Sequence, residues 1–306
     1  MQVLLKSVFS ATFAASILRV TTPILFAALG AVVSDLAGVT NIALEGMMLV
    51  SAFTGVVVST FTGSAWIGLL AGMLAAALMG LTLGYFHLKL RTSIILAGIA
   101  MNLLASGGTV FLLYVVAKDK GVSSSLASKV VPEWQIPLLK DIPLIGAVLG
   151  KQNALTYLSL LAVGVVYFVL YKTSFGLRLR AVGESPDAAD SVGISVHKVQ
   201  FAALAISGLL AGMGGAHLSM GYVSWFSRDM TSGRGYLAMA AEALGRRHPI
   251  GAFFASLFFG VADALSNYMQ SLRVPGEFVS MIPYLLTLIA LAIYARGQSK
   301  GRKAAR

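Results

Sequence analysis

Four ionisable side chains lie inside long apolar stretches of the sequence, namely Glu45, Arg234, Glu242 and Asp263. A charged group at membrane depth is expensive unless it is paired or hydrated, so such groups face a bundle interior or a watery path. Two kinds of chemistry are open to them. They could line a passage for a small polar solute, or they could form internal ion pairs and helix caps.

The neighbouring residues separate these interpretations for two of the four. Glu45 follows Asn41 in a short polar interval that predicts a break in a helix, and this favours a lining role. Glu242 lies three residues before the basic turn 245–247, and this favours a structural role. Asn102, inside another apolar stretch, could hydrogen-bond either to a neighbouring helix or to a solute.

Several other chemistries are excluded. The sequence contains no cysteine, which rules out disulfides, thiolate metal sites and cysteine nucleophiles. It has no GxxxxGK(S/T) phosphate loop, no HExxH helix and no Gly-x-Ser-x-Gly elbow. We therefore expect no catalytic residue, no metal and no cofactor on this chain, and nothing in the sequence supports an intramembrane enzyme.

The composition places these residues in a membrane. Of the 306 residues, 57% are hydrophobic and 11% are charged, whereas a soluble domain has about 25% charged residues. Apolar runs of about 20 residues recur along the chain and suit spanning helices rather than a barrel. We expect an all-α, polytopic membrane helical bundle that forms one transmembrane domain over residues 1–306.

The net charge of +11 does not require a nucleic-acid partner. Lys and Arg collect in the cytoplasmic loops and tails of membrane proteins. The basic tail Arg296–Arg306 fits this rule and predicts a cytoplasmic C-terminus.

The hydrophobic pattern predicts nine or ten spanning segments with broken helices. The number depends on Val8–Val33, which is either one long tilted helix or two short helices that meet near Pro23. The other predicted segments are Met47–Phe61, Ala65–Phe86, Ile94–Ala117, Thr156–Tyr171, Val199–Tyr222, Thr231–Leu244, Pro249–Met269 and Phe278–Tyr294. Residues 118–152 predict an external loop with one interfacial helix that carries Trp134.

Two glycine-interrupted regions, Ser34–Gly46 and Met230–Gly245, fall at loosely corresponding places in the two halves of the chain. Such regions are typical of broken helices beside a central path. Gly208 and Gly212 have the small-xxx-small spacing of a helix that packs closely on a neighbour.

The polar segment 172–198 separates two spans on the side where Lys and Arg collect, and it carries a helix signature. The predicted cap, first-turn and terminating residues are Ser185, Pro186, Asp187 and Gly193. We expect a single short helix here, with a small apolar face made of Ala188, Ala189 and Val192. That face could lie on the membrane or meet a soluble partner, and we favour the partner.

Three stretches carry a family resemblance. Thr22–Phe53 has an Asn-Ile-x-x-Glu-Gly-x-Met core at 41–48, Gly176–Val196 holds the short-helix signature, and Thr231–Gly245 contains Gly-Arg-Gly-Tyr. They resemble the permease subunits of ATP-binding-cassette importers of branched-chain amino acids, simple sugars and nucleosides, and the first stretch resembles the nucleoside branch. The sequence departs from the family at Glu242, where an apolar residue is usual.

The resemblance implies a division of labour in a bacterial inner membrane. Two permease chains, in the nucleoside branch a heterodimer, form the path. Cytoplasmic ATPase subunits bind ATP and magnesium, and an extracytoplasmic binding protein delivers the solute.

The same resemblance assigns residues to each task. The coupling role falls on Glu184, Ser185, Pro186, Asp187, Ala188, Ala189 and Gly193. The solute path falls on Asn41, Glu45, Asn102, Gly233, Arg234 and Gly235. Met47 could also pack against a ring of the solute.

Other functions stay open at this point. The same kind of permease could import a simple sugar or a branched-chain amino acid instead of a nucleoside. A different class, an ion-coupled secondary transporter, would need an ion-binding site at mid-depth, and Glu45 or Asp263 could supply it. Uptake that survives ATP depletion but collapses with the ion gradient would favour that class.

Overall fold

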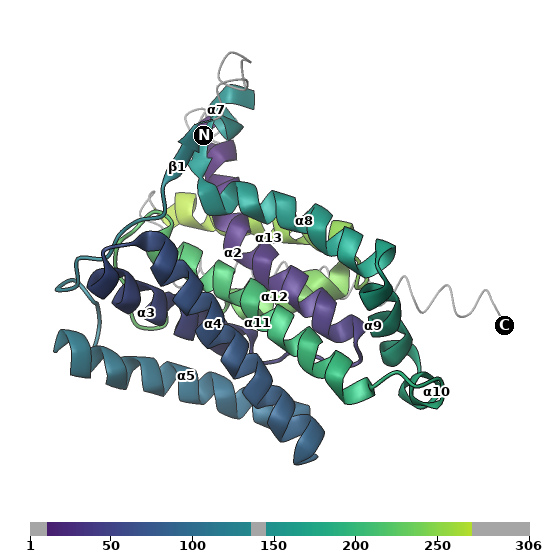
Figure 1. Ribbon diagram of the computed structural model, residues 1–306. Coiled ribbons are helices and arrows are strands. Elements are labelled where there is room, and N and C mark those ends of the chain that lie inside the picture. The colour runs from purple at the N-terminus through teal and green to yellow at the C-terminus, as the bar shows by residue number, and fades with distance from the viewer. Residues whose placement is uncertain (1–10, 136–144, 271–306) are drawn as a thin grey trace.

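The computed structural model describes residues 11–135 and 145–270, and it is a bundle of helices (Figure 1). In this part of the chain, seven helices are long and apolar enough to cross a membrane. They are α2 (Ala11–Leu36), α3 (Leu44–Thr62), α4 (Ala65–Gly84), α5 (Ile94–Ala117), α8 (Ala154–Lys172), α11 (Val196–Met220) and α13 (Pro249–Gln270). A π-helix, η1 (Tyr85–Lys89), extends α4 by one turn.

The first span is one continuous helix, so its division into two short helices near Pro23 is wrong for the described residues. A proline inside a helix has no N–H and leaves the carbonyl four residues earlier without its usual partner. Here that carbonyl belongs to Arg19, and the Nε2 atom of His217 lies 3.3 Å from its oxygen. In its Nε2–H tautomer, the histidine of α11 satisfies the backbone group that the proline frees.

The predicted span Thr231–Leu244 is only a partial span. Its helix, α12, covers Arg234–Leu244 and has 11 residues, which gives a length of about 16 Å at 1.5 Å per residue. The hydrocarbon core of a bilayer is about 30 Å thick, so α12 reaches about halfway through it. The last predicted span, Phe278–Tyr294, lies outside the described residues.

Helix α11 lies at the centre of the bundle, against α2, α3 and α4. A Cβ atom built at Gly208 would lie 2.5 Å from the Ala76 oxygen, and one at Gly212 would lie 2.8 Å from the Met73 Cα. This confirms the prediction that small residues let this helix approach its neighbours closely.

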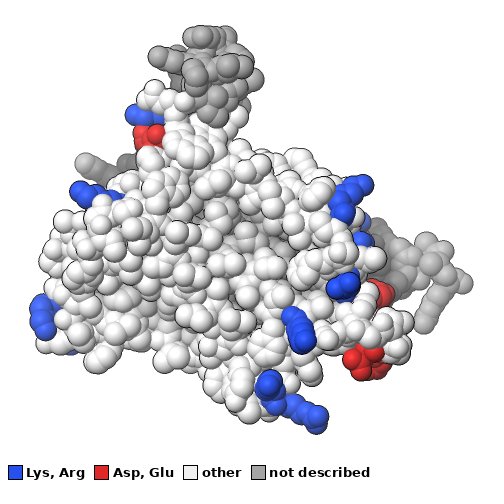
Figure 2. Space-filling model, viewed as in Figure 1, with Lys and Arg blue, Asp and Glu red and all other residues white. Residues whose placement is uncertain are grey.

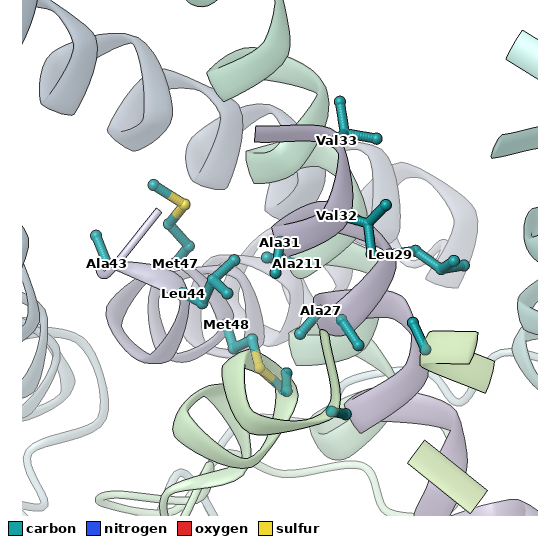
Figure 3. Close-up of a cluster of buried hydrophobic side chains, with 14 of the residues drawn as sticks. Ala27, Leu29, Ala31, Val32, Val33, Ala43, Leu44, Met47, Met48 and Ala211 are labelled. Atoms are coloured by element: carbon teal, nitrogen blue, oxygen red, sulfur yellow. The ribbon is translucent and has the colours of Figure 1, made fainter. Parts of the chain in front are cut away.

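The buried apolar cluster of Figure 3 joins α3 to α2 and α11. Met47 and Met48 of α3 have no exposed surface, and Leu44 lies beside them. Helix α5, by contrast, runs along the edge of the bundle and exposes large apolar side chains, as a lipid-facing helix does.

The segment between α5 and α8 contains a small sheet. Strand β1 (Glu133–Gln135) pairs antiparallel with β2 (Lys151–Asn153), and a short helix α7 (Ile145–Leu149) lies between them in the sequence. Trp134 is in β1, where it faces Gln152 in the register, so the expectation of an interfacial helix carrying Trp134 is wrong. Strand pairing satisfies the backbone there, and a Glu133–Lys151 ion pair of 3.1 Å adds to it.

The polar segment between α8 and α11 holds two helices, not the single short one expected from the sequence. These are α9 (Ser174–Glu184) and α10 (Pro186–Ser191). The Oγ1 atom of Thr173 accepts a hydrogen bond from the Gly176 N–H and caps α9. Leu179 and Val182, three residues apart on one face, are fully buried. We refer to this end of the bundle as the α10 end, and Figure 2 shows several Lys and Arg side chains there.

Candidate functional site

The two predicted helix breaks meet inside the bundle. We call the meeting point the helix-break junction, and it comprises the turn 37–43, the first residues of α3 up to Met47, the start of α12 at 233–236, and Asn102 of α5. The junction lies near the middle of α11, because Asn41 hydrogen-bonds to Ser207 of that helix. Segments that are nearly 200 residues apart in the sequence are thus in contact near the middle of the bundle.

The Glu45 carboxylate is the centre of this junction. Its Oε1 accepts a hydrogen bond of 2.7 Å from the Gly233 N–H, and its Oε2 accepts one of 2.6 Å from the Gly235 N–H. These are free donors at the first turn of α12, which no partner within the helix can satisfy. Glu45 therefore caps a helix of the opposite half of the chain.

The glycines around Arg234 make this contact possible. Gly233 has a φ of +79°, in the left-handed region that side chains rarely adopt. A Cβ atom at Gly235 would lie 2.5 Å from the Glu45 nitrogen. Both positions therefore require glycine, one for its backbone conformation and one for the close approach.

Asn102 joins the two breaks from a third helix. Its Oδ1 accepts a hydrogen bond of 2.8 Å from the Gly46 N–H at the start of α3. Its Nδ2 donates to the Ile42 carbonyl at 2.9 Å and lies 3.2 Å from the Tyr236 hydroxyl on α12. Sequence reasoning predicted either interhelical bonding or solute contact for Asn102, and the structure shows the interhelical bonds.

Arg234 and Asp263 form an ion pair of 2.9 Å between α12 and α13. Their side chains are 19% and 15% exposed. The sequence placed both among four ionisable groups at membrane depth but did not pair them with each other. Each of the two residues therefore has an opposite charge beside it, and neither is an isolated charge in the bundle.

Asn41 and Met47 lie inside protein in the described part of the chain. Asn41 is 1% exposed, donates to the Ser207 hydroxyl at 2.8 Å and to the Met47 sulfur at 3.3 Å, and accepts from the Ala43 N–H. The structure therefore brings all the predicted path residues to one junction. Their contact with a solute stays a prediction.

The predicted coupling residues also lie together, at the α10 end. The Ser185 hydroxyl accepts from the Ala188 N–H, Pro186 is the first helical residue, and Gly193 has a φ of +82°. These confirm the helix signature. Residues 184–188 are exposed. Ala189, in contrast, packs against its own chain and is only 3% exposed.

Helix α9 rests directly on the first break, a contact that sequence reasoning missed. A Cβ atom at Gly183 would overlap the Leu36 carbonyl oxygen at the end of α2. Gln200 at the start of α11 donates to the Ala37 carbonyl at 3.3 Å. Neither residue has a local signal, because both act through segments far away in the sequence.

Charged groups surround a groove of about 380 Å³ beside this contact. Arg247, from the turn after α12, pairs with Asp35 of α2. Arg180 and Glu184 of α9 line the other side. Glu242 is 8% exposed, lies against Asp35, and its Oε1 has no hydrogen-bond partner among the described residues. The structural role expected for Glu242 therefore stays a prediction.

A family model described as the branched-chain amino acid transport system permease component matches residues 13–291. The chain is 35% identical to the nucleoside ABC transporter permease protein NupC of Lactococcus lactis, over 92% of this chain and 91% of the relative. It is 38% identical to the guanosine ABC transporter permease protein NupQ of Bacillus subtilis, over 88% and 87%.

A third relative, from Haloferax volcanii, carries a name that refers to a glucose ABC transporter permease, and it is 35% identical over 92% of each chain. Among solved structures, a metal-chelate type ABC transporter in an inward-facing conformation aligns with a TM-score of 0.55 at 15% identity. It covers 95% of this chain and 89% of its own. That likeness concerns the fold alone.

Proposed function

This chain belongs to the family of permease components of branched-chain amino acid transport systems, and from that premise we propose that it imports nucleosides. It is the membrane permease subunit of an ABC importer, in which we place the ATPase activity on separate cytoplasmic subunits. We assign the α10 end to the cytoplasm of a bacterial inner membrane. A second permease chain and an extracytoplasmic binding protein complete the proposed assembly.

The observation that carries the proposal is the position of α10. It is a capped helix of six residues, exposed along Pro186–Ala188 and held between two spans. A helix this short has little core of its own, so it is suited to seat in a shallow cleft of another protein. The exposed residues of α10 and Glu184 are the proposed contact with the ATPase.

The contact below α10 supports a route from the ATPase to the path. Gly183 lies against Leu36 and Gly38, and Gln200 holds the Ala37 carbonyl. The turn 37–43 leads directly into Glu45 and the helix-break junction. Movement of α9 and α10 as one lever would therefore act on the start of α3, and through Glu45 on α12.

The ion-coupled alternative has less support from the geometry. Such a transporter needs a titratable or ion-binding group available at mid-depth. The two candidates, Glu45 and Asp263, are engaged by backbone N–H groups and by Arg234. Among the described residues, no group of three or more His, Cys, Asp or Glu side chains could hold a metal ion.

The choice of solute rests on the relatives, two of which are named for nucleosides. A simple sugar remains the second candidate, because one relative's name refers to glucose. Purified complex in proteoliposomes, supplied with its binding protein, should take up guanosine when ATP is present. ATP-driven uptake of glucose or leucine, without uptake of a nucleoside, would overturn this assignment.

A substitution at Ala188 tests the coupling assignment. Ala188 is exposed, so Ala188→Asp leaves the fold intact but places a charge in the proposed interface. We expect ATP-driven uptake and binding-protein-stimulated ATP hydrolysis to fall at least tenfold, which corresponds to about 1.4 kcal/mol. Ala188→Ser is the matched control and should keep both activities. Uptake that continues unchanged with the aspartate would show that α10 is not the coupling element.

A further inference from the structure

One carboxylate, that of Glu45, caps the N-terminus of α12 at the helix-break junction. Helix α3 begins at Leu44, with Glu45 in its first turn, and α12 begins at Arg234. The N-terminus of each helix has a partial positive charge of about half an elementary charge. The Glu45 carboxylate therefore lies at the positive end of α12, and Glu45 itself belongs to the first turn of α3.

The charges at this place are paired. The N-terminus of α12 supplies about half a positive charge, which faces the negative charge of the Glu45 carboxylate. Arg234 is paired with Asp263 at 2.9 Å. Asn102 and Tyr236, which complete the contact, are uncharged.

Broken helices in other transporters use such N-termini differently. There the free N–H groups point at an anionic group of the solute. In this chain the corresponding donors, the N–H groups of Gly233 and Gly235, are both taken by Glu45 at 2.7 and 2.6 Å. A carboxylate of the protein occupies the position that a carboxylate of a solute would otherwise take.

We infer that Glu45 is a specificity-determining residue. Its carboxylate fills the anion position at the start of α12, formed by the Gly233 and Gly235 N–H groups, so the path selects uncharged polar solutes over anionic ones. The inference rests on the proposed function, because it requires the solute to pass this junction. It deepens that function by giving a physical reason for rejecting amino acids and other carboxylates. A nucleoside or a sugar offers hydroxyl groups and carries no carboxylate that would compete with Glu45.

Removal of the side chain should expose the anion position. In Glu45→Ala, the Gly233 and Gly235 N–H groups lose both acceptor oxygens, and a small external carboxylate can replace them. In Glu45→Gln, one oxygen remains as an acceptor and the amide nitrogen cannot accept a hydrogen bond. Only one of the two N–H groups therefore loses its acceptor.

The first test uses sodium formate as the probe and the thermal unfolding midpoint of the purified complex in detergent as the readout. We expect Glu45→Ala to unfold at a lower temperature than the wild type, and formate to raise its midpoint by a saturable shift of a few degrees. Sodium chloride at the same ionic strength should have a smaller effect, and the wild type should not respond specifically to formate. Ser207→Ala is the control, because it removes a hydrogen bond of the junction without freeing these N–H groups.

The second test separates specificity from a merely structural role. Radiolabelled adenosine-5′-carboxylate should be retained by the Glu45→Ala complex, should be displaced by formate, and should not be retained by the wild type. If Glu45→Ala does not assemble, Glu45→Gln takes its place with a smaller effect in the same direction.

The outcomes distinguish the two proposals. Retention of the carboxylate by the wild type, or a variant that responds neither to formate nor to the labelled carboxylate, overturns the role of Glu45. If the wild type drives no uptake of nucleosides with ATP, the proposed function itself is wrong, whatever the variants do.

Discussion

The ion pair between Arg234 and Asp263 allows a quantitative prediction. The Arg234 Nη2 atom donates to Asp263 at 2.9 Å, and both side chains are mostly buried. Asp263→Asn removes the negative charge and leaves the guanidinium in place. Breaking a buried pair in this way costs about 3–5 kcal/mol.

The structure places the expected value at the lower end of that range. Arg234 keeps one hydrogen bond after the change, from Nη1 to the Thr231 carbonyl at 3.3 Å. Its remaining exposure of 19% gives the charge some access to water. We expect a loss of about 3 kcal/mol, or roughly 6 °C in the unfolding midpoint for a chain of this size.

Removal of both charges should be much less harmful than removal of one. The Arg234 Nε atom has no hydrogen-bond partner among the described residues, so the pair does not fully repay the cost of burying it. The double variant Arg234→Met/Asp263→Leu should therefore be more stable than Asp263→Asn, and within about 1 kcal/mol of the wild type.

The assay is the thermal unfolding midpoint of the purified complex in detergent, with Glu133→Gln as the matched control. Glu133 and Lys151 form an ion pair of 3.1 Å whose side chains are 40% and 62% exposed. A pair that exposed contributes at most about 1 kcal/mol. The estimate for the buried pair is refuted if Asp263→Asn lowers the midpoint no more than Glu133→Gln does. It is also refuted if the double variant is less stable than both Asp263→Asn and Glu133→Gln.

Three further predictions concern packing. Gly183→Ala should separate α9 from the end of α2 and lower the amount of solute carried per ATP hydrolysed at least tenfold. Gly164→Ala is the control, because Gly164 has open space around it in this chain, and it should leave that ratio unchanged. The proposed route would be contradicted if both variants carried the same amount of solute per ATP. Glu242→Leu should raise the free energy of unfolding by about 1–3 kcal/mol, because it removes a buried oxygen with no hydrogen-bond partner among the described residues. A thermal unfolding midpoint below that of the wild type would contradict this. Gly215→Val should prevent assembly, because the valine side chain would overlap the Met48 carbonyl. The measurement is the amount of folded chain in the membrane. A normal amount would show that α3 and α11 can separate at this position.

Local patterns in the sequence were sufficient for the long spanning helices and for several helix ends. The span Ile94–Ala117 was predicted with the bounds that α5 has, and the cap and stop residues of α10 were predicted individually. These features depend on neighbours along the chain, namely on apolar run length, on a hydroxyl at the cap and on a glycine at the end. A sequence displays such features directly.

The errors arose where a distant segment supplied the missing partner. Pro23 does not divide α2, because His217 of another helix lies against the carbonyl that it frees. Trp134 lies in a strand because β2 pairs with it from the far side of α7. Helix α9 went unpredicted because its buried face is short and is covered by helices of other parts of the chain.

The sequence by itself determined that this is a helical membrane protein, which residues are polar within its apolar stretches, and where two helices are interrupted. Only the tertiary structure decided that the two interruptions meet, that Glu45 caps α12, and that Arg234 pairs with Asp263. The physical reason is that hydrophobicity and capping act between neighbours in the chain. A buried charge or a free N–H group, in contrast, can be satisfied by any segment that packing brings close to it.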